Sequence, residues 1–320
     1  HEGRSQAERF LARPEAAADT YLRARALHTA GVLAFYQGSL ATASASLRES
    51  IALSRQLRGN GKSILTMALI AHGYTLLSLE ERDAAETTAR ESLHLGRELQ
   101  NAYAQGHAFR QLAAVARRRG ESTSEQQHIL TSIECFQTSG DRGMYGIALG
   151  DYGMLLYAQG DYAAAQTYVT DSLTIFEEVG DTARHSRALR QLGVIAMAQN
   201  DNTQAQAHLT QALQSIRTTG QLRLLTDVLD TMGRLAQRQG DPARSSALLQ
   251  ESLGLAVEMS HTPLIARALE ALACLAAAQG EMEKAARLFG ATETHAVAVE
   301  TQLDPVWIAD HERWVAATRA

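Results

Sequence analysis

The chain has 320 residues, of which 45% are hydrophobic, 5% are aromatic and four are proline. Its 30 basic and 35 acidic residues give a net charge of −5, which argues against the strongly basic footprint of a nucleic-acid-binding protein. No apolar run approaches the length of a membrane span, and no signal peptide precedes the first expected helix. The two cysteines, Cys135 and Cys274, lie too far apart in the sequence for a disulfide to be expected, which favours a reducing compartment. We therefore expect a cytoplasmic protein without a direct nucleic-acid or membrane partner.

The first 20 residues are expected to contain a helix without a partner helix. Residues 4–13 form an amphipathic segment with Phe10 and Leu11 on it, and Pro14 follows. We interpret residues 1–20 as a partial helix of a preceding repeat or as an N-terminal cap. On this interpretation the chain is a segment of a larger protein.

Turn residues recur at a fixed spacing of forty residues over most of the chain. They form two series, half a period apart: Gly120, Gly160, Asn200, Gly240 and Gly280, and then Gly140, Gly180, Gly220 and Ser260. A fixed period of this length is typical of a repeat array, in which each unit buries its apolar face against its neighbours. We therefore predict an all-α fold, an α-α superhelix (solenoid) of about seven 40-residue helical hairpins over residues 21–301. The hairpins are expected at 21–57, 63–99, 103–139, 143–179, 183–219, 223–259 and 263–301.

Each expected first helix has a small residue near its middle. These residues are Gly31, Gly73, Ala113, Gly153, Gly193, Gly233 and Ala273. Four residues earlier in each helix stands a large apolar residue: Leu27, Leu69, Phe109, Leu149, Leu189, Leu229 and Leu269. Because residues i and i+4 share one face of a helix, the partner helix can approach closely over the small residue.

The expected second helices carry a matching pattern. Twelve residues after the small position comes an alanine, at Ala43, Ala85, Ala165, Ala205 and Ala285, with Glu125 and Ser245 as exceptions. Four residues later comes a bulky residue, with Ala89 as the exception: Leu47, Ile129, Val169, Leu209, Leu249 and Phe289. The two patterns together predict that the helices of each hairpin pair closely.

This order of positions resembles the tetratricopeptide repeat (TPR) over about residues 21–300. The departure is length, because the common unit has about 34 residues and this unit has about forty. HEAT-like repeats also approach forty residues, but the small-residue positions favour the tetratricopeptide repeat. The resemblance implies a right-handed superhelix in which the first helix of each hairpin lines an inner groove.

Long repeats of this kind are similar to the sensor arms of large bacterial signal-transduction ATPases of the STAND class, of which the activator of maltose genes is an example. Two strings support the resemblance: Arg48–Leu53, echoed at Arg90–Leu93, and Ala285–Ala291, which is similar to the end of the repeat arm in LuxR-type regulators. The resemblance implies a non-catalytic, protein- or effector-binding arm of a larger transcriptional regulator or signalling ATPase. Two alternatives are a free-standing adaptor or assembly scaffold and an inhibitory peptide-pheromone receptor.

The resemblance also implies which residues line the groove, on the first helices of successive hairpins. The candidate ligand-binding residues are His107, Arg110, Arg117, Met154, Tyr157, Arg187, Arg190, Met197, Asp227, Asp230, Arg234 and Arg267. Guanidinium groups suit carboxylate or phosphate, and methionine is an adaptable packing surface. We predict a peptide or protein segment, or a small anionic effector, as the ligand, together with adjacent domains of a larger chain. In the alternative interpretation the arginines form an ordinary solvated face, neutralised by Asp227, Asp230 and Glu270.

The sequence carries no motif for chemistry. Gly59–Ser63 ends in Gly-Lys-Ser, but Gln56 occupies the position where a phosphate-binding loop needs its first glycine, and a helix precedes it. The eleven histidines form no His-Glu-x-x-His string, and no Cys-x-x-Cys pair exists. A Gly-x-Ser-x-Gly elbow is also missing. We therefore predict no catalytic residue, no metal site and no cofactor.

Residues 302–320 are expected to form a C-terminal capping helix. Asp304 and Pro305 suit an N-cap and a first helical turn. One face of this helix would carry Trp307, His311, Trp314, Val315 and Thr318. We expect both tryptophans to cover the exposed end of the last hairpin, the alternative being a docking surface for a neighbouring domain.

Overall fold

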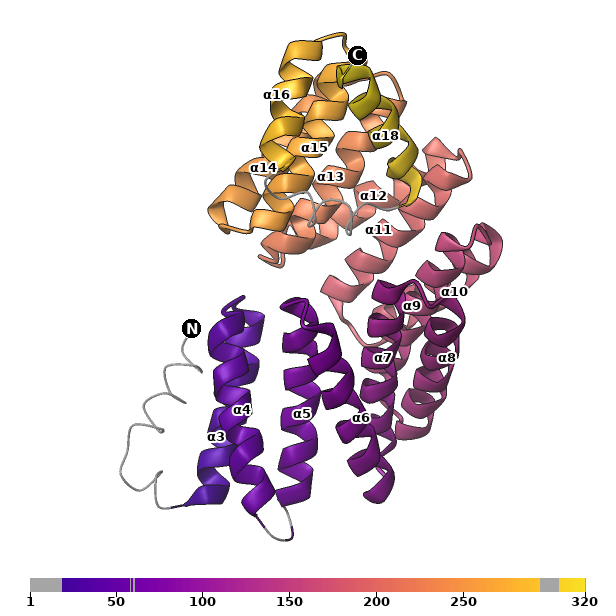
Figure 1. The fold of residues 1–320 in the computed structure, drawn as a ribbon. Helices are drawn as coiled ribbons and strands as arrows, with labels where there is room; N and C mark the ends of the chain where they lie inside the picture. The colour runs from indigo at the N-terminus through magenta and orange to yellow at the C-terminus, as the bar shows by residue number, and fades with distance from the viewer. Residues whose placement is uncertain (1–18, 58, 60, 294–304, 320) are drawn as a thin grey trace. The chain divides into compact units, whose positions relative to one another are not determined.

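The structure is a computed structural model, and it describes residues 19–57, 59, 61–293 and 305–319. The helix expected within residues 1–20, the end of the last expected hairpin after Glu293 and the expected N-cap Asp304 lie outside this range. Every regular element in the described range is an α-helix, which confirms the predicted fold class (Figure 1). A final helix follows the last hairpin at Pro305–Arg319.

The helices form consecutive antiparallel pairs. We call the first helix of each hairpin its A helix and the second its B helix. The A helices are α3 (Thr20–Tyr36), α5 (Gly61–Ser78), α7 (Ala102–Arg119), α9 (Arg142–Ala158), α11 (Thr182–Ala198), α13 (Leu222–Arg238) and α15 (Thr262–Ala278). The B helices are α4 (Leu40–Gln56), α6 (Arg82–Glu98), α8 (Ser122–Ser139), α10 (Tyr162–Glu178), α12 (Asn202–Ile216), α14 (Pro242–Glu258) and α16 (Met282–Glu293). The last helix is α18 (Pro305–Arg319).

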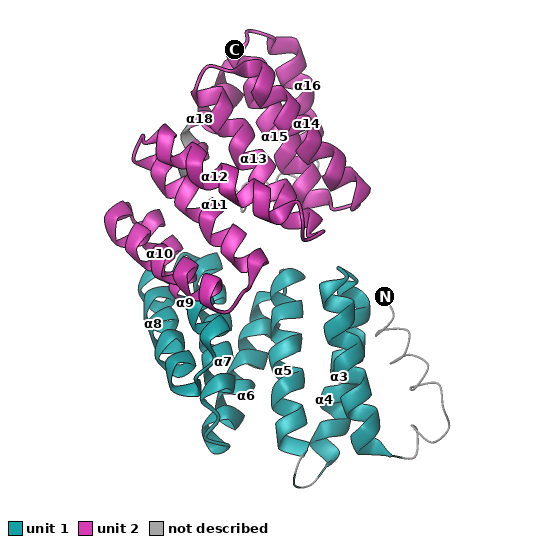
Figure 2. Ribbon diagram, turned by 180° about the vertical axis from the view of Figure 1, so that it is seen from behind, with its two compact units in different colours: residues 1–148 teal, residues 149–320 magenta. Residues whose placement is uncertain are grey.

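The chain divides into two compact units, and the boundary falls inside α9, between Ala148 and Leu149 (Figure 2). In unit 1, the successive A helices α3, α5 and α7 contact one another, and each pairs with its B helix. In unit 2, the A helices α11, α13 and α15 do the same, and α18 packs against α15, α16 and α11. Each unit therefore presents a surface made of successive A helices.

The turns between helices follow the predicted period. Every glycine of the two predicted series has a positive φ, and so do Asn200 (61°) and Ser260 (51°). Glu80 and Gln100 extend the two series toward the N-terminus, also with positive φ. A left-handed residue ends a helix and lets the next one begin within a few residues, so this backbone state explains why glycine recurs at these positions.

Aspartates directly after several of these turns start the next helix. The side chain of Asp161 accepts a hydrogen bond from the Ala164 backbone N–H at 3.1 Å. Asp201 and Asp241 make the same contact, each with the N–H three residues later, at 2.9 and 3.0 Å. Each such N-cap contributes about 1 kcal/mol to helix stability.

The predicted contact between the small and the bulky positions is present in the hairpins. A Cβ atom placed on Gly233 would lie 2.6 Å from Cγ of Leu249, and the same overlap relates Gly193 to Leu209 at 2.7 Å. Leu249 and Leu209 are fully buried. The absence of a side chain on the A helix thus makes room for the bulky residue of the B helix.

The second hairpin, where Ala89 interrupts the bulky series, fills this space differently. The amide of Gln111, from the A helix of the next hairpin, lies over Gly73. Gln111 is fully buried, and its Nε2 donates a hydrogen bond to the carbonyl oxygen of Ile70 at 2.7 Å. A polar side chain from the next repeat therefore occupies the space that a bulky residue occupies elsewhere.

We expect Gly233→Ala to destabilise the protein by about 1–3 kcal/mol, because the added methyl group overlaps Leu249 in a packed interior. Gly254→Ala on α14 is the matched control, since nothing lies within 4 Å of a Cβ atom at that exposed helical position. The control should stabilise the protein by about 0.5–1 kcal/mol through helix propensity. Thermal unfolding of both variants checks the prediction, and equal shifts would contradict it.

Candidate functional site

The A helices of unit 2 carry a buried network of charged side chains. Arg234 lies on α13, and its Nε is 3.2 Å from Oδ2 of Asp230, one turn earlier. Its Nη2 is 2.5 Å from Oε2 of Glu270 on α15. The exposed fractions of the three side chains are only 5%, 6% and 0%. A buried ion without a partner costs several kcal/mol, so removal of any one of these three charges would destabilise the folded protein.

A second arginine extends the network. Nη2 of Arg267 on α15 donates to Oδ1 of Asp227 at 2.5 Å, and its Nε lies 3.7 Å from Oδ2 of Asp230. The result is a chain of alternating charge: Asp227, Arg267, Asp230, Arg234 and Glu270. Arg267 holds the pKa of Asp227 below its usual value, although burial alone would raise it.

The C-terminal helix α18 lies on this network. The guanidinium carbons of Arg234 and Arg238 lie 5.2 and 5.1 Å from the ring centre of Trp307, within cation-π range. Trp307 is buried and joins an apolar cluster with Leu189 and Met197 of α11. One turn further along α18, Nδ1 of His311 lies 3.0 Å from Oε1 of Glu270.

The two tryptophans of α18 have different surroundings. Trp314 and Val315 pack against the cluster around Phe289 of the last hairpin, as expected for a capping helix. Trp307 instead reaches past this hairpin to the apolar cluster of α11, α12 and α13. The helix therefore covers part of the A-helix surface of unit 2 in addition to the last hairpin.

Glu270 has three polar partners in this region: Arg234, Cys274 and His311. Burial alone would raise its pKa, but Arg234 and the hydrogen bonds from His311 and Cys274 outweigh burial and hold the pKa at about 2. Glu270 is therefore ionised at neutral pH. Burial and the neighbouring Glu270 carboxylate raise the pKa of the Cys274 thiol, which donates to Oε1 of Glu270 at 3.1 Å.

Three potential metal ligands meet here, although the sequence carries no local metal motif. One ligand atom from each of Glu270, Cys274 and His311 lies within 4.8 Å of the other two. Glu270 and Cys274 belong to the last expected hairpin and His311 to the last expected helix, and no sequence motif connects them. Their positions in the chain give no sign of this meeting, because His311 lies 41 residues after Glu270.

In unit 1, His107 and Arg110 of α7 form a smaller cluster with Tyr74 of α5. The hydroxyl of Tyr74 lies 2.9 Å from Nδ1 of His107 and accepts a hydrogen bond from Nη1 of Arg110 at 3.1 Å. Burial, and to a lesser extent the charge of Arg110, lower the pKa of His107 to about 3. His107 is therefore neutral at physiological pH.

The other predicted groove residues differ in accessibility. Arg117 and Arg187 are exposed, while Met154 and Arg190 are partly buried. Nη1 of Arg190 donates to the Thr231 hydroxyl at 3.3 Å. Tyr157 and Met197 are 3% and 0% exposed, so their side chains belong to the core.

The structure thus brings part of the predicted set together. Asp227, Asp230, Arg234 and Arg267 form one network in unit 2, and Arg190 lies beside it through Thr231. His107 and Arg110 share the separate cluster in unit 1.

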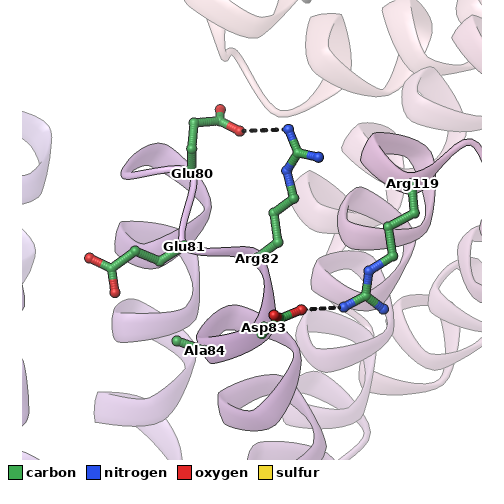
Figure 3. A pocket seen from close by; sticks show the side chains of 6 residues that line it. All are labelled: Glu80, Glu81, Arg82, Asp83, Ala84 and Arg119. Atoms are coloured by element: carbon green, nitrogen blue, oxygen red, sulfur yellow. Dashed lines mark hydrogen bonds and ion pairs between the residues drawn. The ribbon is translucent and has the colours of Figure 1, made fainter.

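Two other features, an open pocket in unit 1 and the Gly-Lys-Ser string, are explained by surface ion pairs and by the connection between two hairpins. An open pocket in unit 1 is lined by Glu80, Glu81, Arg82, Asp83, Ala84 and Arg119 (Figure 3). Arg119 pairs there with Asp83 at 2.7 Å and Arg82 with Glu80 at 3.8 Å, which are surface ion pairs of small net energy. In the Gly-Lys-Ser string, Gly61 begins α5 and Lys62 pairs with Glu98 of α6, as in a connection between hairpins.

Successive helical hairpins, in each of which the A and B helices pair closely, and A helices that contact the A helix of the next hairpin define a helical repeat protein. Residues 144–218 match the tetratricopeptide repeat family. The comparison of the sequence with curated proteins gave no match. None of the described helices combines the length and the apolar character needed to cross a membrane.

Solved structures share the fold at low sequence identity. The quorum sensor NprR from B. thuringiensis, in its apo form, is 12% identical, with a TM-score of 0.69 over 86% of this chain and 77% of that one. The Rap protein complexed with competence and sporulation factor is 11% identical, with a TM-score of 0.67 over 92% and 80%. A STAND ATPase with a tetratricopeptide repeat sensor, from Pyrococcus horikoshii, is 14% identical, with a TM-score of 0.60 over 90% of this chain and 46% of that one. This likeness establishes a TPR-like fold.

Proposed function

We propose that this chain is a non-catalytic, cytoplasmic arm that binds a peptide, a protein segment or a small anionic effector. We further propose that it is the sensor of a larger bacterial regulator, either a LuxR-type transcriptional regulator or a STAND signalling ATPase. The observation that carries the proposal is the contact between α18 and the A helices of unit 2. There α18 places Trp307 beside Arg234 and Arg238. A helical ligand would bind in the same way, with an apolar side chain packed against the A helices.

The charge of this surface indicates the ligand chemistry. Arg187 and Arg190 lie one turn apart on α11, and Arg190 borders the buried network. An arginine side chain can bind a carboxylate or a phosphate through two parallel hydrogen bonds. We therefore favour an acidic ligand with at least one aromatic or large apolar side chain.

The solved structures with this fold support a sensory function. One is a Rap protein in complex with competence and sporulation factor, one is a quorum sensor, and one is a signalling ATPase whose repeats are described as a sensor. By extension, we propose that ligand binding to the arm is passed to adjacent domains of a larger chain. Because the contacts between neighbouring repeats are small and numerous, a ligand that bridges several A helices can favour one arrangement of them.

The test is a thermal-shift screen with synthetic acidic peptides that each contain one aromatic residue. A binding peptide should raise the melting temperature, and Arg187→Glu combined with Arg190→Glu should abolish the rise. The matched control is Arg244→Glu combined with Arg287→Glu, two exposed B-helix positions of the same unit with the same change in charge. If the α11 variant keeps the full shift, or if the control loses it equally, the ligand does not bind at this surface.

The alternative is a free-standing TPR adaptor or assembly scaffold. It shares the fold and the A-helix surface but needs no attached ATPase. The genomic reading frame distinguishes the two: a nucleotide-binding module in the same frame supports the sensor, and its absence favours the adaptor.

A further inference from the structure

The side chains of Glu270, Cys274 and His311 converge from two helices. Glu270 and Cys274 lie one turn apart on α15 and therefore share a face. His311 reaches the same place from α18, so that Oε1 of Glu270 has the Cys274 sulfur at 3.1 Å and Nδ1 of His311 at 3.0 Å. All three ligand atoms lie within 4.8 Å of one another.

These separations suit a tetrahedral metal ion. Zinc bonds to sulfur, nitrogen and oxygen place neighbouring ligand atoms about 3.4–3.6 Å apart. The two contacts would need to lengthen by only about half an ångström to reach that spacing. The His311 side chain is 21% exposed while Glu270 is fully buried, so one side is open to solvent for entry and for a water ligand.

In the surrounding network, carboxylates offset the positive charge of the arginines. The alternating chain Asp227, Arg267, Asp230, Arg234 and Glu270 contains three carboxylates and two guanidinium groups, a net charge of −1. A divalent ion that displaces one thiol proton adds +1 to these five side chains.

The guanidinium group of Arg234 does not block the site. It binds Oε2 of Glu270, whereas Cys274 and His311 contact Oε1, so the two oxygens have separate partners. A metal-binding carboxylate commonly accepts such a second hydrogen bond, which fixes its orientation. Asp230 offsets the positive charge of Arg234.

We propose that Glu270, Cys274 and His311 form a binding site for a divalent cation of the zinc class, which ties α18 to α15. Thiolate and imidazole ligands select zinc or cobalt over magnesium or calcium. On binding, the S–H bond of Cys274 breaks, its proton leaves to solvent, and a sulfur–metal bond forms. Nδ1 of His311 gives up to solvent the proton that it donates to Oε1 of Glu270, Nε2 takes up one proton from solvent, and the lone pair freed on Nδ1 binds the metal. This site goes beyond the proposed effector binding and does not depend on it.

The test is the addition of Co²⁺ to the metal-free protein under reducing conditions. A stoichiometric complex should show the near-ultraviolet thiolate-to-cobalt band and the visible bands of a tetrahedral ion, and Zn²⁺ should displace it. Cys274→Ser should abolish the thiolate band. Cys135→Ser is the matched control and should keep it, because Cys135 is the only other cysteine of the chain.

A second variant and a stability measurement distinguish loss of the metal site from misfolding of Cys274→Ser. His311→Gln, at a partly exposed position, should weaken cobalt binding by on the order of tenfold or more, since loss of even a supporting partner of a metal ligand has that effect. Zn²⁺ should raise the melting temperature of the wild-type protein and not that of Cys274→Ser. The proposal is overturned if excess Co²⁺ gives no thiolate band with the wild-type protein, or if the band depends on Cys135.

Discussion

Arg234→Met is expected to destabilise the protein by about 3–5 kcal/mol, because it leaves the buried carboxylates of Glu270 and Asp230 without their shared cation. Methionine preserves most of the length and apolar surface of the side chain, so the loss reports mainly on charge. Chemical denaturation of the full chain, followed by circular dichroism, measures the change.

Two further variants identify the cause. Arg238→Met removes the other guanidinium group beside Trp307, but from an exposed position, and should cost no more than about 1 kcal/mol. Adding Glu270→Gln to Arg234→Met should recover part of the loss, since it removes the charge that was left without its arginine. Equal effects of Arg234→Met and Arg238→Met would show that the buried ion pairs do not stabilise unit 2.

Trp307→Ala is expected to destabilise the protein by about 3–5 kcal/mol and to release α18 from the A helices. Trp307 is 4% exposed and packs against the cluster that includes Met197, so its removal leaves a cavity that α18 cannot easily close. Hydrogen exchange of α18 should become much faster, and the emission of the remaining Trp314 should shift toward that of a solvated indole.

Ile308→Ala is the control for this prediction. Ile308 is the neighbouring residue on the same helix and is 41% exposed, so its truncation should change stability by at most about 0.5 kcal/mol. Unchanged exchange of α18 in Trp307→Ala, or a loss of stability as small as that of Ile308→Ala, would mean that Trp307 does not hold the helix.

The repeat architecture was predictable because its cause is local and periodic. The position of Gly233 four residues after Leu229 defines one helix face, and Leu249 lies at the matching place sixteen residues later. Each hairpin forms from residues close together in the sequence, so the forty-residue pattern was enough to pair its helices. The turn at Ser260 shows the strength of the pattern, since it takes a positive φ without a glycine.

The candidate sites were predictable only in part. Periodicity indicated that Asp227, Asp230, Arg234 and Arg267 share the A-helix side, and the structure joins them in one network. The same periodicity placed Met197 there, although this side chain is fully buried. A face pattern assigns a direction to each side chain, but the depth of burial depends on what the neighbouring elements cover.

By itself, the sequence determined the all-α repeat, the helix pairs and the residues that share each face, because these depend on propensities and contacts within a few turns of helix. Only the tertiary structure decided which faces meet. It placed Trp307 of α18 beside Arg234 of α13, and it brought His311 to Glu270 and Cys274. These contacts join residues at least 37 positions apart, and the helix that makes them packs across several repeats, so no local pattern specifies its position.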